Sequence, residues 1–290
     1  MAHLIPGVMY SEVKGSMFSN MTKKECNRLK LKYSVNHIDF TFEEAISEAE
    51  NFLKRKLVDL KSQLELAHEN YDAAAYDSDG LMNDSHEVEE TLSLVFDLES
   101  DIDMNEQQLY CFSEMKIVHL FRAYEITLKK VIKTALPSEN EKDFFNWEKL
   151  REFCKRNGFD IKSVPSYLEI DQLRLVNNSI KHSSNIDPRV KKNVPQFSDE
   201  TEFSYATLSR FYSSVREHLL PFLQGIAKGL ESHIYDYSEE KINKIVDEYR
   251  EVMDSSELKL LSERINQAAV NDKVSPLESL SIFAVAKKRT

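Results

Sequence analysis

The chain has 290 residues, of which 41% are hydrophobic and 30% charged, and this balance suits long helices with broad solvated faces. Its low content of glycine (6) and proline (7) excludes a turn-rich β architecture, so we expect a mostly α fold. No run approaches the roughly 18 apolar residues of a membrane-spanning helix, and the three cysteines fit no zinc or redox spacing, which predicts a cytoplasmic protein without metal or cofactor.

The acidic residues are concentrated in one part of the chain, which the formal net charge of −11 does not reveal. Between Lys61 and Lys116 there is no lysine or arginine, while aspartate and glutamate are frequent. We interpret residues 76–106 as an acidic insertion. Two interpretations stay open: a solvated segment, or an arm that covers a basic groove or contacts a basic partner.

Residues 1–40 are interpreted as a separate N-terminal extension. Near its end, apolar residues alternate with polar ones at Leu29, Leu31, Tyr33 and Val35. A period of two is typical of a half-buried strand. Since one strand cannot stand alone, the sequence predicts a small β element with a partner strand near residues 8–13.

The first long helix is predicted to begin at Thr41. Thr41 as N-cap and Glu44 three residues later form the pattern of a capping box. Apolar residues then recur at steps of four and three from Phe42 to Tyr71, which is the stripe of an amphipathic helix. The sequence DSDGLMND, residues 77–84, breaks this pattern.

The same rhythm predicts further helices over residues 87–100, 104–136, 147–156, 167–182 and 200–230. A loop through Pro188 and Pro195 precedes the last of these, and Pro221 should kink or interrupt it. Residues 236–290 are predicted to form two or three short helices, the last of which opens at Ser275-Pro276.

The long stripes are each apolar on one side only, so each must be buried against the others. We therefore expect an antiparallel helical bundle over residues 41–232, with a C-terminal helical extension over residues 233–290. A coiled-coil rod is the competing arrangement. Helix-breaking residues favour the compact bundle, namely Gly80, Pro137, Gly158 and Pro188.

The helix predicted over residues 167–182 contains the most informative polar residues. Arg174, Asn178 and His182 follow one another at steps of four, so they form one polar row beside the apolar stripe. Asp171 begins this row and Lys181 flanks it. Arginine grips phosphate through two parallel hydrogen bonds, and histidine exchanges protons near neutral pH. These groups suit cleavage of RNA without a metal ion.

Residues 120–136 and 173–183 resemble the central and late helices of the HEPN family, whose members cleave RNA or associate with it. In that family a glutamate often lies on the earlier helix, as Glu125 does here, and an arginine, often followed by asparagine, precedes a histidine on the later one. The resemblance implies a toxin or anti-phage defence protein of bacteria, and a homodimer in which the Arg/His sites of two copies face each other. The catalytic residues that it implies are Arg174, Asn178, His182 and Glu125.

The match departs from the family pattern in its spacing. Seven residues separate Arg174 from His182, one more than the family pattern allows. If Asn178 and His182 are aligned instead, Asn177 occupies the position of the arginine. Either Arg174 takes the role of that arginine from one turn earlier, or the chain is a member without nuclease activity.

Basic residues near the row predict a groove that follows an RNA backbone. They are Lys129, Lys133, Lys181, Arg189, Lys191 and Lys192. Solvated helix faces would produce the same clusters. A function of another class also fits the sequence: a non-catalytic helical module that binds a protein partner through the acidic segment or the C-terminal helices.

Overall fold

The computed structural model describes residues 22–36, 38–76, 86–139, 144, 146–182 and 185–270. Within these residues every regular element is a helix and the helices pack as a bundle. None of them is both long enough and apolar enough to cross a membrane. Contacts divide the chain into two compact units: unit 1 comprises Met1–His37, Thr127–Val164 and Leu223–Thr290, and unit 2 comprises Ile38–Ile126 and Pro165–Phe222.

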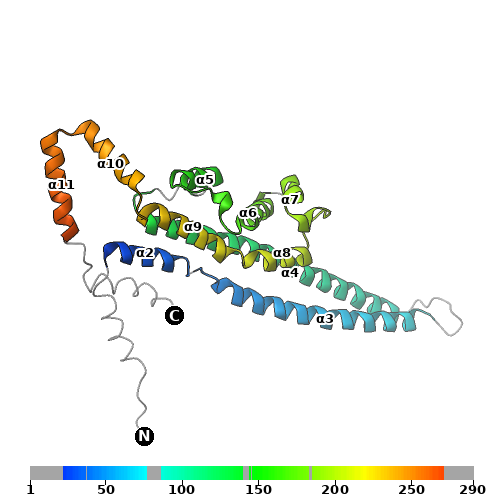
Figure 1. Cartoon of the computed structure of the whole chain (residues 1–290). Helices are drawn as coiled ribbons and strands as arrows, with labels where there is room; N and C mark the ends of the chain where they lie inside the picture. Colours follow the sequence, from blue (N-terminus) through cyan, green and yellow to red (C-terminus); the bar gives the residue numbers. More distant parts are fainter. Residues whose placement is uncertain are drawn as a thin grey trace, which may run out of the picture. The chain divides into compact units, whose positions relative to one another are not determined.

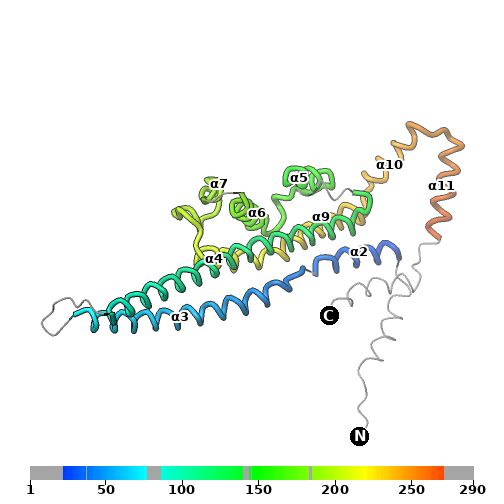
Figure 2. Tube along the Cα trace, turned by 180° about the vertical axis from the view of Figure 1, so that it is seen from behind, coloured from blue at the N-terminus to red at the C-terminus, as the bar shows by residue number. Residues whose placement is uncertain are grey.

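Two long helices form the frame of unit 2, namely α3 (Thr41–Ala75) and the part of α4 (His86–Ala135) that ends at Ile126. They lie side by side and run in opposite directions (Figure 1, Figure 2). Their apolar stripes meet in a core cluster of Leu60, Ala67, Val95, Leu98 and Ile102. Next to this cluster, the buried side chain of Asn105 donates a hydrogen bond of 2.9 Å to the backbone oxygen of Leu53.

The start of α3 at Thr41 is confirmed, but the predicted capping box is wrong. Phe40 is the N-cap residue and makes no side-chain cap. The hydroxyl of Thr41 instead donates to Oδ1 of Asp39 at 2.7 Å. Thr41 is the first residue inside the helix. The same Asp39 oxygen also accepts a hydrogen bond from the backbone N–H of Thr41.

The helices predicted over 87–100 and 104–136 are one continuous helix, the 50-residue α4. Ile102 and Asn105 are both buried, so the inward-facing side of the helix continues through the acidic residues between them. The described part of the predicted acidic insertion is the first half of α4 and packs against α3. Residues 77–84, where the break in the pattern was expected, lie outside the described residues.

Unit 2 also contains α6 (Tyr167–His182), the short α7 (Pro188–Asn193), the 3-10 turn η3 (Pro195–Phe197) and α8 (Tyr205–Arg216). The helix predicted over 167–182 is confirmed. The predicted loop after it contains α7 and η3, each of which has a proline in its first turn, where a missing N–H is tolerated.

The helix predicted over 200–230 is interrupted, as Pro221 led us to expect. It forms α8 and α9 (Leu219–Tyr235), with Pro221 in the first turn of α9. Ser204 begins α8 with a capping box that uses Thr207. This motif places the start of α8 later than residue 200.

Unit 1 contains α2 (Lys23–Ser34), the end of α4, α5 (Trp147–Arg156), the 3-10 turn η2 (Ile161–Ser163) and α9 from Leu223 onward. Its most deeply buried side chains include Ile132, Leu150, Phe153, Ile161, Ile226 and Leu230. A Cβ atom on Gly229 of α9 would lie 2.9 Å from the ring of Phe159. A larger residue at position 229 would therefore require the Phe159 ring to shift.

The strand predicted over Leu29–Val35 is wrong, because helix α2 extends to Ser34 and Val35 is its C-cap. Thr22 and Glu25 form the capping box that starts the helix. Leu31 and Val35, one helical turn apart, are buried, whereas Tyr33 between them is 44% exposed. The N-terminal β element is thus not present among the described residues, and its partner near residues 8–13 lies outside them.

Two helices follow α9 in unit 1, namely α10 (Glu239–Val252) and α11 (Ser255–Val270). They agree with the short helices predicted over residues 236–290. Neither contains a buried residue. The helix start expected at Ser275-Pro276 lies outside the described residues.

Candidate functional site

Helix α6 places the predicted polar row on the side that faces away from the core of unit 2. Its core side is formed by Ile170, Leu173 and Val176, all of which are fully buried. The helix starts directly after Ser166, whose hydroxyl lies 2.9 Å from Nδ1 of His218. That contact joins the start of α6 to the residues that separate α8 from α9.

The three members of the row differ in exposure. Arg174 is half-buried, and Asn178 and His182 are exposed. Asp171 orients Arg174, because its Oδ1 atom lies 2.8 Å from Nε and 2.7 Å from Nη2 of the guanidinium. The row is therefore accessible, and its arginine is paired with the carboxylate that begins it.

Asn177 and Asn178 lie next to each other in the sequence but face different surroundings. Asn177 is 1% exposed, and its Oδ1 atom has no hydrogen-bond partner within the part of the chain that the structure describes. Its Nδ2 atom donates a long hydrogen bond of 3.4 Å to Oδ1 of the exposed Asn178. Position 177 thus faces the core, and position 178 faces solvent.

The end of α6 contacts α4 near the predicted glutamate. The ammonium of Lys181 lies 5.8 Å from the centre of the Phe121 ring, a cation–π contact. Glu125, one turn after Phe121, is half-buried. Its carboxylate makes no hydrogen bond or ion pair with any residue that the structure describes.

Four of the six predicted RNA-binding cations belong to the connected pair α6 and α7. The backbone N–H of Asp187 donates to the hydroxyl of Ser179 on α6, and Gln172 donates to the last turn of α7. Lys181, Arg189 and Lys192 are exposed, and Lys191 is half-buried.

The other two predicted cations, Lys129 and Lys133, belong to unit 1. On α7, Arg189 is partly engaged, because it pairs with Asp187 at 2.8 Å. Hydrogen bonds from its side chain and backbone hold the pKa of Asp187 below the ordinary value. Helices α6 and α7 thus present three lysines and one arginine that a neighbouring carboxylate orients.

A cluster of charged residues that the sequence did not suggest joins α3, α4 and α8. Nε and Nη2 of Arg216 donate to the two carboxylate oxygens of Glu43, at 2.6 and 2.8 Å, and the hydroxyl of Tyr212 donates to the same carboxylate. Lys116 pairs with the buried Glu50 at 2.6 Å and lies 5.1 Å from the centre of the Tyr212 ring. The cluster fastens three helices together.

Comparison with known proteins gives no relative from which a function could be transferred. No protein-family model matches the chain, and neither a curated protein nor a solved structure does. The function must therefore be inferred from where the chain places its own side chains.

Proposed function

We propose that this chain is a HEPN-like bundle protein of a bacterial toxin or anti-phage defence system that binds RNA on the surface of α6 and α7. In this proposal the row of Arg174, Asn178 and His182 cleaves the bound RNA without a metal ion. The observation that supports it most directly is the accessibility of the row, since Asn178 and His182 are exposed beside fully buried positions of the same helix.

The proposed cleavage needs only groups that this row contains. The 2′-oxygen of a ribose loses its proton and attacks phosphorus, the bond from phosphorus to the 5′-oxygen breaks, and the departing oxygen takes up a proton. The products are a 2′,3′-cyclic phosphate and a 5′-hydroxyl. The imidazole of His182 can accept the first proton and, as the imidazolium, donate it to the departing 5′-oxygen, while Arg174 would stabilise the charge on the phosphoryl oxygens.

Asp171 does not prevent Arg174 from binding phosphate. An ion pair between partly exposed side chains contributes only about 0–1 kcal/mol to stability. A phosphate forms charge-assisted, often bidentate hydrogen bonds with arginine, so it can compete with the carboxylate. We expect Asp171 to hold the guanidinium in the row until RNA replaces it.

The burial of Asn177 supports the alignment in which Arg174 takes the role of the family's arginine. A side chain at position 177 faces the core of unit 2, and an arginine there would have to leave the core to reach a nucleotide. Arg174, in contrast, lies in the same row as Asn178 and His182.

The test is incubation of the purified full-length chain with a labelled single-stranded RNA in the presence of EDTA. We expect cleavage that leaves 2′,3′-cyclic phosphate ends, and His182→Ala should slow it by about 10²–10⁴-fold, the usual contribution of a general acid or base. His68→Ala, at an exposed histidine of α3, should cleave at the wild-type rate.

Arg174→Ala should also slow cleavage, and α10 offers a matched control. Arg250 pairs with an aspartate three residues earlier on its helix, as Arg174 does, so Arg250→Ala removes a similar surface pair outside the row. Unchanged cleavage in His182→Ala or Arg174→Ala would contradict the assigned site.

Helix α10 favours a second candidate function, the binding of a protein partner. Ile242, Ile245 and Tyr249 follow at steps of three and four, and each is 40–49% exposed. A stripe of this kind normally packs on another surface. In reconstitution with a purified partner from the native host, Ile245→Asp should abolish binding, whereas Asp247→Asn should not.

The acidic segment is the other surface proposed for such a partner. Its exposed acids can be neutralised without unfolding, as in Asp97→Asn with Glu99→Gln, whereas deletion would remove the buried Val95, Leu98 and Ile102. Loss of partner binding in the neutralised variant, with Ile245→Asp unaffected, would assign the partner to α4.

A further inference from the structure

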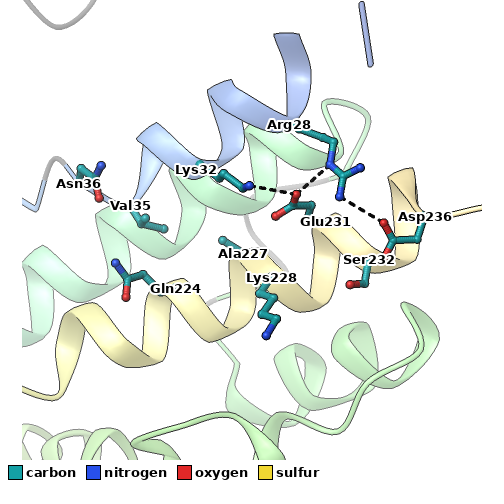
Figure 3. Close-up of a pocket in the computed structure, with 10 residues that line it drawn as sticks. All are labelled: Arg28, Lys32, Val35, Asn36, Gln224, Ala227, Lys228, Glu231, Ser232 and Asp236. Carbon is teal, nitrogen blue, oxygen red and sulfur yellow. Dashed lines mark hydrogen bonds and ion pairs between the residues drawn. The ribbon is translucent and has the colours of Figure 1, made fainter. Parts of the chain in front are cut away.

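A pocket opens in unit 1 where α2 packs against α9 (Figure 3). Its volume is about 640 Å³, and sites for small molecules usually measure about 300–1,000 Å³. Arg28 and Lys32 line it from α2, and Lys228 and Glu231 line it from α9. The two helices run antiparallel here, since Arg28 pairs with Glu231 and Asp236 near the end of α9.

The apolar part of the lining lies at the contact between the two helices. Val35, which directly follows α2, and Ala227 of α9 are buried there. The polar residues of the lining lie on the adjoining turns. The result is an apolar floor with a polar border.

One cation of this border is held in a fixed position. Glu231 is 9% exposed, and its Oε1 atom accepts a hydrogen bond of 2.8 Å from Nε of Arg28. Asp236 binds Nη2 of the same guanidinium at 3.2 Å. Figure 3 shows the guanidinium between these two carboxylates. Arg28 is thus oriented before any ligand arrives.

Two further cations are free to adapt. Lys32 lies 3.5 Å from Glu231, and its side chain is 61% exposed, so this weak pair costs little to break. Lys228 is exposed and makes no hydrogen bond or ion pair with any residue that the structure describes. The border therefore has three cations against two carboxylates, with the amide of Gln224 as a neutral donor beside them.

We propose that this pocket binds a small molecule that carries one phosphate or carboxylate group. The single excess positive charge of the lining matches one such group. The two carboxylates would repel the successive phosphates of a nucleic acid, which distinguishes this pocket from the surface of α6 and α7. The proposal is independent of the function proposed for that surface.

Titration of the full-length chain with inorganic phosphate, and separately with acetate, followed by calorimetry and thermal unfolding, tests the proposal. We expect saturable binding of at least one of them and a higher unfolding temperature. Lys228→Gln should weaken that binding by about tenfold, the usual effect of losing one charge-assisted hydrogen bond, without changing the unfolding temperature of the free chain.

Lys244→Gln, at an exposed lysine of α10, is the matched control and should bind like the wild type. Arg28→Lys keeps the charge but removes the fork that joins Glu231 and Asp236, so it should also weaken binding. The proposal is overturned if neither anion binds saturably, if Lys228→Gln binds as the wild type does, or if a short single-stranded RNA displaces phosphate at stoichiometric amounts.

Discussion

The carboxylate of Glu43 connects the start of α3 to α8 through Arg216 and Tyr212. Burial raises the pKa of Glu43. The hydrogen bonds from Arg216 and Tyr212 lower this pKa by more than burial raises it, so the pKa lies below the ordinary value. Burial and the bond to Glu43 raise the pKa of Tyr212 in turn. The charged form of Glu43 is thus the form that the folded chain prefers.

A pH dependence of stability follows for Glu43. A carboxyl group with a lowered folded-state pKa stabilises the fold above its unfolded pKa, about 4.3 for glutamate, and this contribution is lost as the pH falls through the folded value. We expect Glu43→Gln to lower the urea midpoint at pH 7, and the difference from wild type to shrink as the pH falls below about 4.3. Glu44→Gln, at the exposed neighbouring residue, should change the midpoint little at any pH.

The sequence could predict the polar row on α6, but it could not predict the cluster around Glu43. Arg174, Asn178 and His182 lie on one helix at steps of four, so helical periodicity alone places them in one row. Glu43 and Arg216 are 173 positions apart, and no local pattern connects them. The period of the sequence predicts neighbours on one helix, whereas contacts between helices depend on packing that a single sequence does not specify.

At the scale of helices, α2 shows why an alternating pattern can mislead. The residues that suggested a strand include one pair four apart, Leu31 and Val35, which also fits a helix. The capping box of Thr22 and Glu25 was the local signal that could have decided between the two. In α4, acidic residues hid a stripe that Ile102 and Asn105 continue, so one helix was predicted as two.

If residues 29–34 are helical, substitutions at Leu31 and Tyr33 should differ in their effect on the free energy of unfolding. Leu31→Ala should destabilise the fold by about 2–5 kcal/mol, because Leu31 is 1% exposed. Tyr33→Ala should change stability by only about 0.5 kcal/mol, because Tyr33 is 44% exposed. Denaturant unfolding measures both. Equal losses in the two variants would favour the strand, in which both side chains share one face.

The HEPN-like proposal includes a homodimer in which the rows of two copies face each other. Sedimentation at micromolar concentration should then give about twice the chain mass of 33.7 kDa. RNA cleavage per chain should fall when dilution dissociates the dimer. A chain that remains monomeric while it cleaves RNA would contradict this arrangement.

Because the net charge is −11, the proposed RNA binding would depend on a few local cations. Each cation that neutralises a phosphate of single-stranded RNA contributes about −0.7 to the slope of log K against log salt. Arg174 of the row, together with Lys181, Arg189, Lys191 and Lys192, predicts a slope of about −3.5. Lys192→Gln should make the slope shallower by about 0.7, and Lys244→Gln should leave it unchanged, as filter binding over a roughly sixfold range of salt, from about 50 to about 300 mM, would show.

Helices α10 and α11 contain no buried residue, so the free energy needed to unfold them locally should be low. Helices of 14 and 16 residues are marginal in water when nothing packs on them. Their amide hydrogens should therefore exchange with deuterium long before those of α4 or α9, and a protease should trim the chain back towards Tyr235. A partner that binds these helices should therefore be detectable as slower exchange of their amide hydrogens.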